Sequence, residues 1–301
     1  MRKTPCISVV MPVFNVENYI SHAIDSILSQ SFEDFEFIII DDASTDNTAS
    51  ILSKYNDSRI VLIRNIRQIG VARSINKGIY YSRGKYIARM DGDDISLKDR
   101  FEKQIAYMEY YSNIGICGSF FKIINRDGQS LHSQKKPIGD ENIRMGLFWG
   151  RTSLAHPSII IRKGLLDKYN LRYDPAFYYA EDYDLYCRSS LFFSLDNIPE
   201  ELIEYRIHEN SVSQKYIEHQ KLDARMALYL HLKRLGLDFK YQEFISHGKI
   251  FLKLPNESDL SIDDVKKCIE QAVHFNNSQD LFDKTNFECT CKEIEKKYKR
   301  K

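Results

Sequence analysis

The sequence predicts an α/β protein whose core is a mainly parallel β-sheet covered by helices. Three observations support this. Short apolar runs alternate four times with segments of helical spacing, the connections between them are short, and polar residues directly follow three of the runs. The length of 301 residues fits one large domain, or one domain with an appendage.

The first half of the chain shows this alternation most clearly. Short β-branched runs predict strands at residues 7–11, 35–40, 60–63 and 86–88. Apolar spacing predicts helices at 20–28, through Ile51 and Leu52 with a cap at 44–46, at 70–81 and at 97–111. Pro12 is expected to close the first strand, so that residues 12–15 form a loop.

The alternation weakens in the second half. We expect a strand at 114–124 interrupted by Gly118, a turn at 126–129, a loop from His156 into a strand, a helix at 178–191 and a short extended segment ending at 205–208. Helices are expected from about residue 215 to the end. This gives a domain over 1–215, with halves at about 1–112 and 113–215, and a helical extension over 216–301.

Charge and cysteine content exclude several classes of protein. The formal net charge of +1 gives no field that would attract nucleic acid. Six scattered cysteines fit reduced cytosolic thiols better than a disulfide framework. No apolar run approaches the length of a membrane span, and Pro12 and Asn15 interrupt the first one, so we expect a cytoplasmic protein without a signal peptide.

Three polar loops, at residues 12–15, 41–46 and 91–94, directly follow predicted strands. Because ligands of parallel sheets bind outside the carboxyl ends of the strands, these loops should gather along one edge. The sequence has neither the glycine fingerprint of a dinucleotide site nor a P-loop. Bound phosphates would therefore be neutralised by a metal ion and by side chains.

The third loop places Asp91, Asp93 and Asp94 around Gly92. Carboxylates this close repel one another unless a counter-charge is present. Hard oxygen ligands suit Mg²⁺ or Mn²⁺, which would hold a diphosphate against the loop. The alternative is a solvated acidic turn in which Asp94 or Ser96 caps the following helix.

Taken together, these motifs resemble the family 2 glycosyltransferases, the inverting nucleotide-sugar enzymes with the GT-A fold. The resemblance covers about residues 5–215. The matching segments, in the order of the family, are 12–15, 41–46, Gly70 with 76–78, 84–86, 91–94 and 180–182. The longer phrases at 88–94, 179–183 and 205–210 look most like bacterial enzymes of lipooligosaccharide and capsule glycan synthesis, some of which use a UDP-N-acetylhexosamine donor.

The resemblance implies a donor site in the first half of the domain. Asp93 would be the metal ligand, Asp91 would lie closer to the ribose and assist the metal, and Asp94 would support the site. Asp42 would contact the uracil edge. The wall beside the base would be formed by Pro12, Val13 and Phe14.

Further donor contacts are implied around residues 68–92 and 206–208. Gln68 stands where the family often has Asn, and Ile75 stands where it often has Arg, although Arg73 lies nearby. We expect Gln68, Arg73 and Gly92 to border the nucleotide-sugar. Arg206 and His208 alternate on an extended segment and share a face, so Arg206 would reach the diphosphate and His208 the metal. The alternative for both is a surface pair.

The resemblance also implies an acceptor site. Asp182 would be the general base, and Glu181 would contact the acceptor or orient Asp182. The start of a helix should lower the pKa of Asp182; the alternative is that both are ordinary first-turn acids. His156 would line the acceptor side or be satisfied by backbone groups. Trp149 would stack on a sugar or, more commonly, be buried in the core.

The leading hypothesis is a metal-dependent inverting glycosyltransferase that moves a sugar from a UDP-sugar to a glycan or glycolipid acceptor. The alternatives are a nucleotidyltransferase and a non-catalytic sugar-nucleotide or glycan-binding module. Lysine and arginine are frequent at 292–301, which predicts a solvated tail or peripheral attraction to the cytoplasmic face of an anionic inner membrane. The helical extension would pack on the domain or on another subunit in an oligomer.

Overall fold

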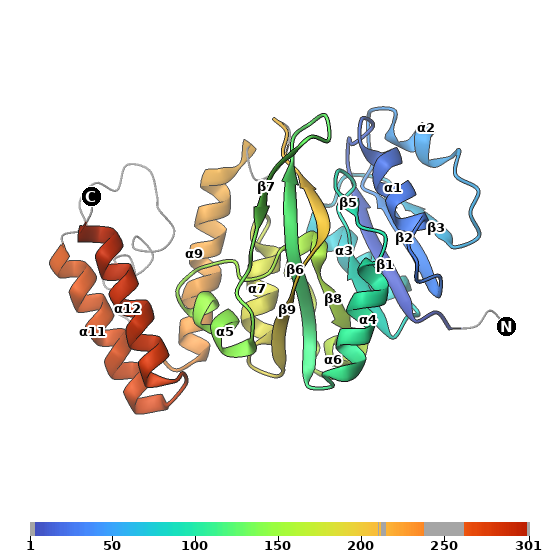
Figure 1. Ribbon diagram of the computed structural model, residues 1–301. Coiled ribbons are helices and arrows are strands. Elements are labelled where there is room, and N and C mark those ends of the chain that lie inside the picture. Colours follow the sequence, from blue (N-terminus) through green and yellow to red (C-terminus); the bar gives the residue numbers. More distant parts are fainter. Residues whose placement is uncertain (1–3, 210, 212–214, 238–261, 300–301) are drawn as a thin grey trace.

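The computed structural model describes residues 4–209, 211, 215–237 and 262–299. Within these ranges, nine strands form one sheet in the order β3-β2-β1-β4-β8-β6-β9-β5, and β7 pairs with β6. Figure 1 shows helices on both sides of this sheet and a two-helix hairpin at one end of the molecule.

The elements have the following bounds. The strands are β1 (Ile7–Val13), β2 (Phe35–Asp41), β3 (Ile60–Arg64), β4 (Tyr86–Arg89), β5 (Ile95–Ser96), β6 (Ile114–Ile124), β7 (Ser130–Gln134), β8 (Ile160–Arg162) and β9 (Ser194–Arg206). The helices are α1 (Ile20–Leu28), α2 (Thr48–Leu52), α3 (Val71–Tyr81), α4 (Arg100–Tyr110), α5 (Asp140–Phe148), the 3-10 turn η1 (His156–Ser158), α6 (Lys163–Lys168), α7 (Glu181–Ser189), α9 (Ile217–Arg234), α11 (Ile262–Gln279) and α12 (Lys284–Lys299).

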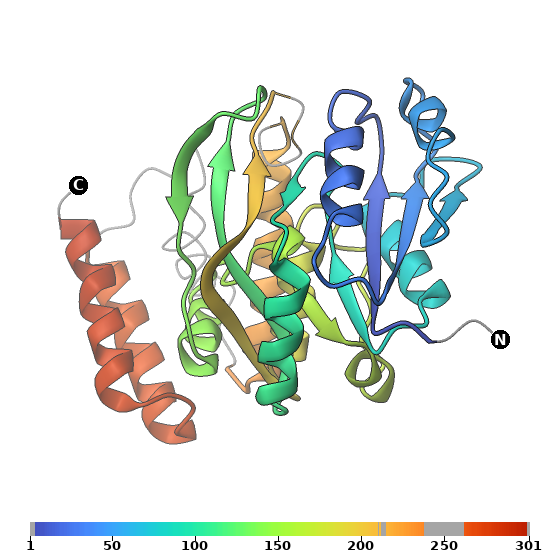
Figure 2. The ribbon, with the colours of Figure 1, turned by 45° about the vertical axis from the view of Figure 1, so that its right-hand side comes forward.

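The first four strands form the predicted parallel arrangement. β1 pairs in parallel with β2 and with β4, and β2 pairs in parallel with β3. Successive residues of a strand point to opposite faces, so Val9 packs in the core beside α1 and Val10 in the core beside α3. Figure 2 shows α1 and α4 together on one side of the sheet. Burial of both faces explains why β1 and β2 are mostly apolar and do not alternate between apolar and polar residues.

The second half of the sheet is mixed. β8 is antiparallel to both β4 and β6, whereas the long strands β6 and β9 are parallel to each other. β7 and the short β5 add antiparallel partners at the edges. β6 continues through Gly118, where the side chain of Asn197 leaves no room for a Cβ atom. The glycine thus permits a close approach of β9 and does not interrupt the strand.

Pro12 does not close β1, as the sequence predicted, but lies inside it, opposite Ile40. The amide of Met90 donates to the carbonyl of Val10, so alternate residues of β1 face β4. β4 ends at Arg89, which is paired with Val10. Pro12 faces the same way but lies beyond the end of β4, so its missing N–H is not needed by the sheet.

Other boundaries differ from the sequence prediction for local reasons. α2 begins at Thr48, whose amide donates to Asp46 Oδ1 over 2.9 Å. α7 begins at Glu181, three residues later than expected. The segment predicted as short and extended is the end of β9, a strand of 13 residues. β9 pairs with β6 (Ile114–Ile124) over most of this length. The backbone hydrogen bonds between them stabilise both long strands.

The C-terminal helices pack on the rest of the protein. α9 lies against α7 and α5, and the α11–α12 hairpin meets α5 through an aromatic cluster. In that cluster Trp149 stacks on Phe287 with ring centroids 5.5 Å apart, and Phe148 meets Phe282 at 5.7 Å. Trp149 is fully buried. It is therefore a core residue, as the sequence predicted as the more common outcome, and its ring is not accessible to a sugar. In the described part of the chain, no helix has the length and apolarity needed to cross a membrane.

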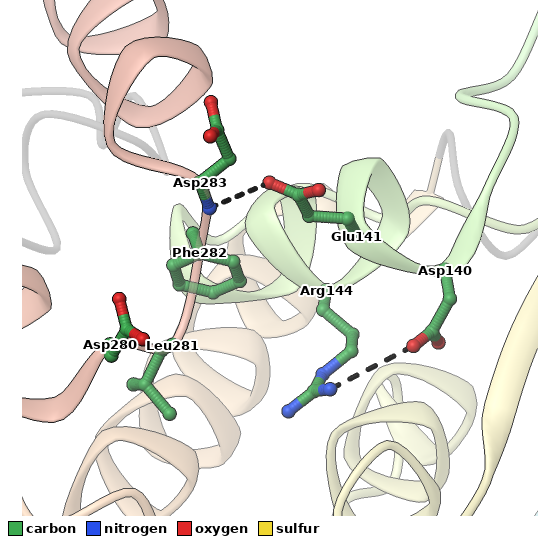
Figure 3. A pocket seen from close by; sticks show the side chains of 7 residues that line it. All are labelled: Asp140, Glu141, Arg144, Asp280, Leu281, Phe282 and Asp283. Atoms are coloured by element: carbon green, nitrogen blue, oxygen red, sulfur yellow. Dashed lines mark hydrogen bonds and ion pairs between the residues drawn. The ribbon is translucent and has the colours of Figure 1, made fainter.

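A pocket of about 310 Å³ lies at the joint between α5 and the hairpin, and Figure 3 shows its lining. Glu141 accepts a hydrogen bond from the amide of Asp283 over 2.9 Å, and Arg144 lies 3.7 Å from Asp140. Asp280, Leu281 and Phe282 complete the wall. The bond between Asp283 and Glu141 fastens the hairpin to α5, and none of the predicted site residues borders the pocket.

We predict that Phe287→Ala will lower the free energy of unfolding by about 3 kcal/mol, because it leaves a cavity in the aromatic cluster. Phe287 is 1 % exposed and stacks on both Trp149 and Phe282. Urea denaturation followed by fluorescence of Trp149, the only tryptophan, measures the change. Tyr80→Ala is the control, because Tyr80 is 80 % exposed and its loss should change stability by less than about 0.5 kcal/mol. Equal effects of both substitutions would show that the hairpin contributes no stability to the body.

Candidate active site

The three polar loops meet at one edge of the sheet, as predicted. Val13 lies opposite Asp41, and Val10 lies opposite Arg89, so the carboxyl ends of β1, β2 and β4 are aligned. The amide of Asp42 donates to the carbonyl of Val13 over 2.8 Å. Pro12 and Val13 are buried in β1, whereas Phe14 is 37 % exposed and is the part of the predicted wall that a base can reach.

Asp42 holds the loop between β3 and α3. Its carboxylate accepts hydrogen bonds from Asn65 Nδ2 over 2.7 Å and from the amides of Ile69 and Gly70, each over 2.9 Å. A carboxylate has about four acceptor positions, so one remains for the predicted uracil edge. These three hydrogen bonds also fix the conformation of the loop, so Asp42 has a structural role as well.

Gln68 and Arg73 are both exposed beside this loop. Arg73 Nη1 donates to the carbonyl of Ile69 over 3.2 Å, which keeps its side chain near the loop. Gly70 has φ 89°, and the ring of Tyr178 lies 2.9 Å from the place a Cβ would occupy. Tyr178, which precedes α7, therefore covers the donor-side loop from the acceptor half of the chain.

The acidic loop has three different environments. Asp91 forms an ion pair with Arg89 Nη1, and Asp93 Oδ2 lies 2.9 Å from His208 Nε2. Asp94 is buried, and its Oδ1 accepts a hydrogen bond from the amide of Arg206 over 2.8 Å. The cap predicted as an alternative is wrong, because α4 begins at Arg100 without a side-chain cap.

Gly92 lets the acidic loop lie directly on β1. A Cβ atom there would lie 2.8 Å from Val13 Cγ1 and 3.2 Å from Val16 Cγ2. Contacts this short would push the loop away from the strand. Gly92 therefore sets the position of Asp91 and Asp93 at the strand edge.

Arg206 is not a free phosphate ligand in this geometry. The side chain is buried, its Nε donates to the carbonyl of Asp93 over 2.8 Å, and its Nη1 donates to the carbonyls of Asn125 and Arg126, each over 3.1 Å. Backbone carbonyls engage Nε and Nη1, and a contact between the remaining Nη2 and the nucleotide-sugar stays a prediction. Arg206 also joins the acidic loop to the β6–β7 turn.

Tyr19 is a residue of the site that the sequence did not indicate. Its ring lies 4.7 Å from the ring of His208, and the Arg206 guanidinium lies over it at 5.0 Å. These contacts hold His208 toward Asp93. The residue directly precedes α1, at a position where the helical pattern gave no reason to single it out.

The Asp93 carboxylate and the His208 imidazole fit a divalent cation. Both are half-buried and lie side by side at the strand edge, and oxygen with imidazole nitrogen is a donor set that Mn²⁺ accepts. In the described residues, no group of three or more His, Cys, Asp and Glu side chains is arranged for a metal, and the role of Asp91 as a further ligand stays a prediction. A two-ligand site would be completed by substrate phosphate and water.

Burial and mutual repulsion raise the pKa of the neighbouring acids. The pKa of Asp94 is raised well above its ordinary value by burial and then by Asp93 and Asp91. The pKa of Asp91 is raised by burial, against the effect of Arg89. The three carboxyl groups therefore do not ionise together easily without a further cation.

On the acceptor side, Glu181 and Asp182 form the first turn of α7. Asp182 is half-buried, and its Oδ1 accepts a hydrogen bond from the amide of Tyr183 over 2.7 Å. The prediction that the helix start lowers the pKa of Asp182 is wrong, because burial raises it. Burial and the charge of Asp182 raise the pKa of Glu181 to about 8.

His156 belongs to the same cluster. Its Nδ1 lies 3.8 Å from Glu181 Oε1, and its Nε2 lies 2.9 Å from the hydroxyl of Tyr173. It is therefore satisfied by side chains of the acceptor side, not by backbone. Burial and the charge of Arg89 hold the pKa of His156 well below its usual range, so the imidazole is neutral.

Arg89 lies between the two groups of acids. It is 3 % exposed and pairs with Asp91 of the donor side, and its charge also opposes the raised pKa of Glu181 and Asp182. The sequence signal was an arginine in an apolar strand end, directly before the acids. A buried cation at that point indicates the counter-charge for carboxylates brought from elsewhere.

Two solved structures share this fold. Staphylococcus aureus TarS 1-349 in complex with UDP-GlcNAc aligns with a TM-score of 0.64 and 18% identity, covering 98% of this chain and 91% of that one. The mannosyltransferase PcManGT from Pyrobaculum calidifontis, in complex with GDP-Man and Mn²⁺, aligns with a TM-score of 0.59 and 14% identity, covering 92% and 76%. The protein therefore has the GT-A type of glycosyltransferase fold.

Sequence relatives identify the family. The family model described as "Glycosyl transferase family 2" matches residues 8–169. An uncharacterized glycosyltransferase of Haemophilus influenzae is 31% identical over 91% of each chain. The O-antigen biosynthesis glycosyltransferase WbnJ of Escherichia coli is 33% identical over 71% of this chain and 84% of its own. The UDP-Glc:alpha-D-GlcNAc-diphosphoundecaprenol beta-1,3-glucosyltransferase WfgD of the same organism is 29% identical over 60% and 68%. This chain belongs to glycosyltransferase family 2, which confirms the family that the sequence motifs predicted.

We predict that Glu181→Gln will stabilise the protein increasingly as the pH rises from about 5 to about 8. In the unfolded chain Glu181 ionises near 4.5, but in the folded protein only near 8. A group with a raised folded pKa loses stability as the pH rises through that range. The melting temperature of the variant should match that of the wild type near pH 4.5 and exceed it by a few degrees at pH 8.

The control for this experiment is Glu293→Gln, which replaces an exposed carboxylate on α12. Its melting curve should follow the wild type at every pH. A difference between Glu181→Gln and the wild type that is independent of pH would contradict the assigned ionisation.

Proposed function

We propose that the protein is a metal-dependent inverting glycosyltransferase that moves a sugar from a UDP-sugar to a glycan or glycolipid acceptor. The observation that carries the proposal is the separation of two kinds of acid. Asp93, paired with His208, lies at the strand edge, and Asp182 lies at the start of α7, with the buried Arg89 between the groups. Glycosyl transfer needs one group for the leaving diphosphate and another for the attacking hydroxyl.

The donor side would bind the nucleotide and its diphosphate. Phe14, the free acceptor position of Asp42, and the exposed Gln68 and Arg73 would contact the base and the phosphates. Asp93 and His208 would hold Mn²⁺ or Mg²⁺, which supplies positive charge to the departing diphosphate. The solved TarS complex with UDP-GlcNAc supports UDP and an N-acetylhexosamine as the donor, and the PcManGT complex with Mn²⁺ supports the metal.

The acceptor side would remove the proton of the attacking hydroxyl. Burial and the charge of Asp182 raise the pKa of Glu181 to about 8, so Glu181 carries a proton at neutral pH. The base role would then fall to Asp182, whose pKa is raised by burial. The raised pKa of Asp182 makes it a stronger base than an exposed aspartate. A single displacement with one base inverts the anomeric centre.

The relatives suggest where this reaction is used. WbnJ is named for O-antigen biosynthesis, and WfgD is named for transfer to a sugar on diphosphoundecaprenol. Both names support a role in surface-polysaccharide synthesis, and the cytoplasmic face of the membrane remains the predicted location. Lys292 and Lys296 of the basic end lie on α12, and residues 300–301 lie outside the described ranges.

We predict that Asp93→Asn and His208→Ala will each weaken Mn²⁺-dependent binding of UDP about ten- to hundredfold, since each removes one of the proposed metal ligands. Isothermal titration calorimetry with UDP, with Mn²⁺ or with EDTA, measures the affinity. In EDTA the wild type should fall to the level of the variants. Asp127→Asn, at an exposed acid of the β6–β7 turn, is the control and should bind like the wild type. Unchanged affinity of Asp93→Asn with Mn²⁺ would sink the metal assignment.

We predict that Asp182→Asn will lower the rate of transfer about 10²- to 10⁴-fold, because an amide cannot accept the proton. UDP affinity should stay within about twofold of the wild type, since Asp182 lies on the acceptor side. In the wild type, activity should fall as the pH drops through the raised pKa of Asp182. UDP release from a panel of UDP-sugars, with candidate acceptors, measures the rate. Asp174→Asn, at an exposed acid before α7, is the matched control; normal turnover by Asp182→Asn would refute the base assignment.

A further inference from the structure

A small group of cations lies on the segments that follow β7 and α5, and the second of these segments leads to His156 of the acceptor side. It comprises Lys135 and Lys136, which follow β7, and Arg151, which follows α5. Lys136 Nζ donates to the carbonyl of Thr152 over 3.0 Å, so the two segments lie together. We call these three residues the acceptor-side cations.

The acceptor-side cations differ from other basic residues nearby in having no acid partner. Lys122 lies 3.8 Å from Glu201, Arg126 lies 3.5 Å from Asp127, and Arg144 lies 3.7 Å from Asp140. Across the described residues, by contrast, none of the acceptor-side cations forms an ion pair. Their positive charge is therefore available to a ligand.

Lys136 is the member that faces the candidate base. Its side chain is half-buried, with Nζ 5.7 Å from the centre of the Phe121 ring. Burial lowers the pKa of Lys136, and the charge of Asp182 acts against this, so the ammonium and this carboxylate interact without forming an ion pair. A half-buried ammonium without a paired anion is uncommon, because desolvation of its charge is not offset.

The remaining bonding capacity of Lys136 fits an oxyanion. An ammonium group has three N–H donors, and the carbonyl of Thr152 uses one. Two donors are left for a ligand. An anionic acceptor would otherwise be repelled by Asp182, and a cation beside that carboxylate offsets the repulsion.

We propose that the acceptor carries a phosphate or carboxylate close to the hydroxyl that is glycosylated, and that Lys136 binds this anion. This inference rests on the proposed function, since it names the substrate class of the same acceptor site. The shared chemistry is an oxyanion within one sugar of the attacking oxygen. It has two sources: the phosphate of a lipid diphosphate, as in the substrate for which WfgD is named, or the carboxylate of an acidic sugar in a polymer.

The test uses the full chain saturated with UDP and Mn²⁺, so that the donor phosphate site is filled. The probes are N-acetylglucosamine 1-phosphate for the phosphate source, glucuronic acid for the carboxylate source, and neutral N-acetylglucosamine. Binding is measured by calorimetry. In parallel, amine acetylation of each lysine is measured by mass spectrometry with and without each probe.

We expect at least one anionic probe to bind about tenfold tighter than the neutral sugar, a difference of about 1.4 kcal/mol. That probe should protect Lys136 from acetylation and leave Lys122 unprotected. Lys136→Met should abolish the preference for the anion, Lys136→Arg should keep it, and the control Lys122→Met should keep it. Protection by the phosphate probe alone assigns the first source, and protection by the carboxylate probe alone assigns the second.

The inference is overturned if neither anion binds better than the neutral sugar, or if Lys136→Met keeps the preference. In that case Lys136 is only a counter-charge for Asp182. The acetylation readout in the wild type needs no variant, so a folding defect in Lys136→Met does not prevent a decision. Failure of the wild type to bind UDP with Mn²⁺ would instead contradict the proposed function.

Discussion

The buried charge of Arg89 is the interaction on which the site depends. Asp91, Glu181 and Asp182 come from chain segments some ninety residues apart, and without a cation between them their repulsion would push these segments apart. Arg89 ends β4, and β4 lies between β1 of the parallel half and β8 of the mixed half. The counter-charge thus sits where the two halves of the sheet join, and the site forms at that join.

The strand edge in turn requires close packing. Gly92 lies on Val13, Tyr178 lies on Gly70, and Asp42 holds the loop that includes Gly70. Tyr19 and Arg206 then fix His208 and the backbone of Asp93. Each of these contacts joins segments distant in sequence, and together they leave few ways to place the Asp93–His208 pair. A site held this closely requires little reorganisation when a charged substrate binds.

Most of the parallel half was predictable from the sequence, because its strands are mostly apolar runs and its helices have clear apolar faces. The prediction that Pro12 ends β1 was wrong because a missing N–H matters only where a neighbouring strand continues. Where β4 ends cannot be read from the sequence. The pKa of Asp182 was predicted in the wrong direction because local helix position is visible in sequence and burial is not. Tyr19, Tyr173 and Lys136 carried no local signal, since their importance comes from partners brought close by the fold.

The aromatic cluster around Trp149 constrains which segments can be exchanged between this protein and a relative. The core that contains Phe148 and Phe287 is continuous with the one that contains Tyr183 and Leu185 of α7 and Leu228 of α9. The helices after residue 215 therefore share side-chain packing with the helix that presents Asp182. Chimeras that join this catalytic half to the C-terminal region of a relative must exchange the facing surfaces of α5 and α7 as well. Recombination at this boundary alone would pair mismatched cores next to the acceptor.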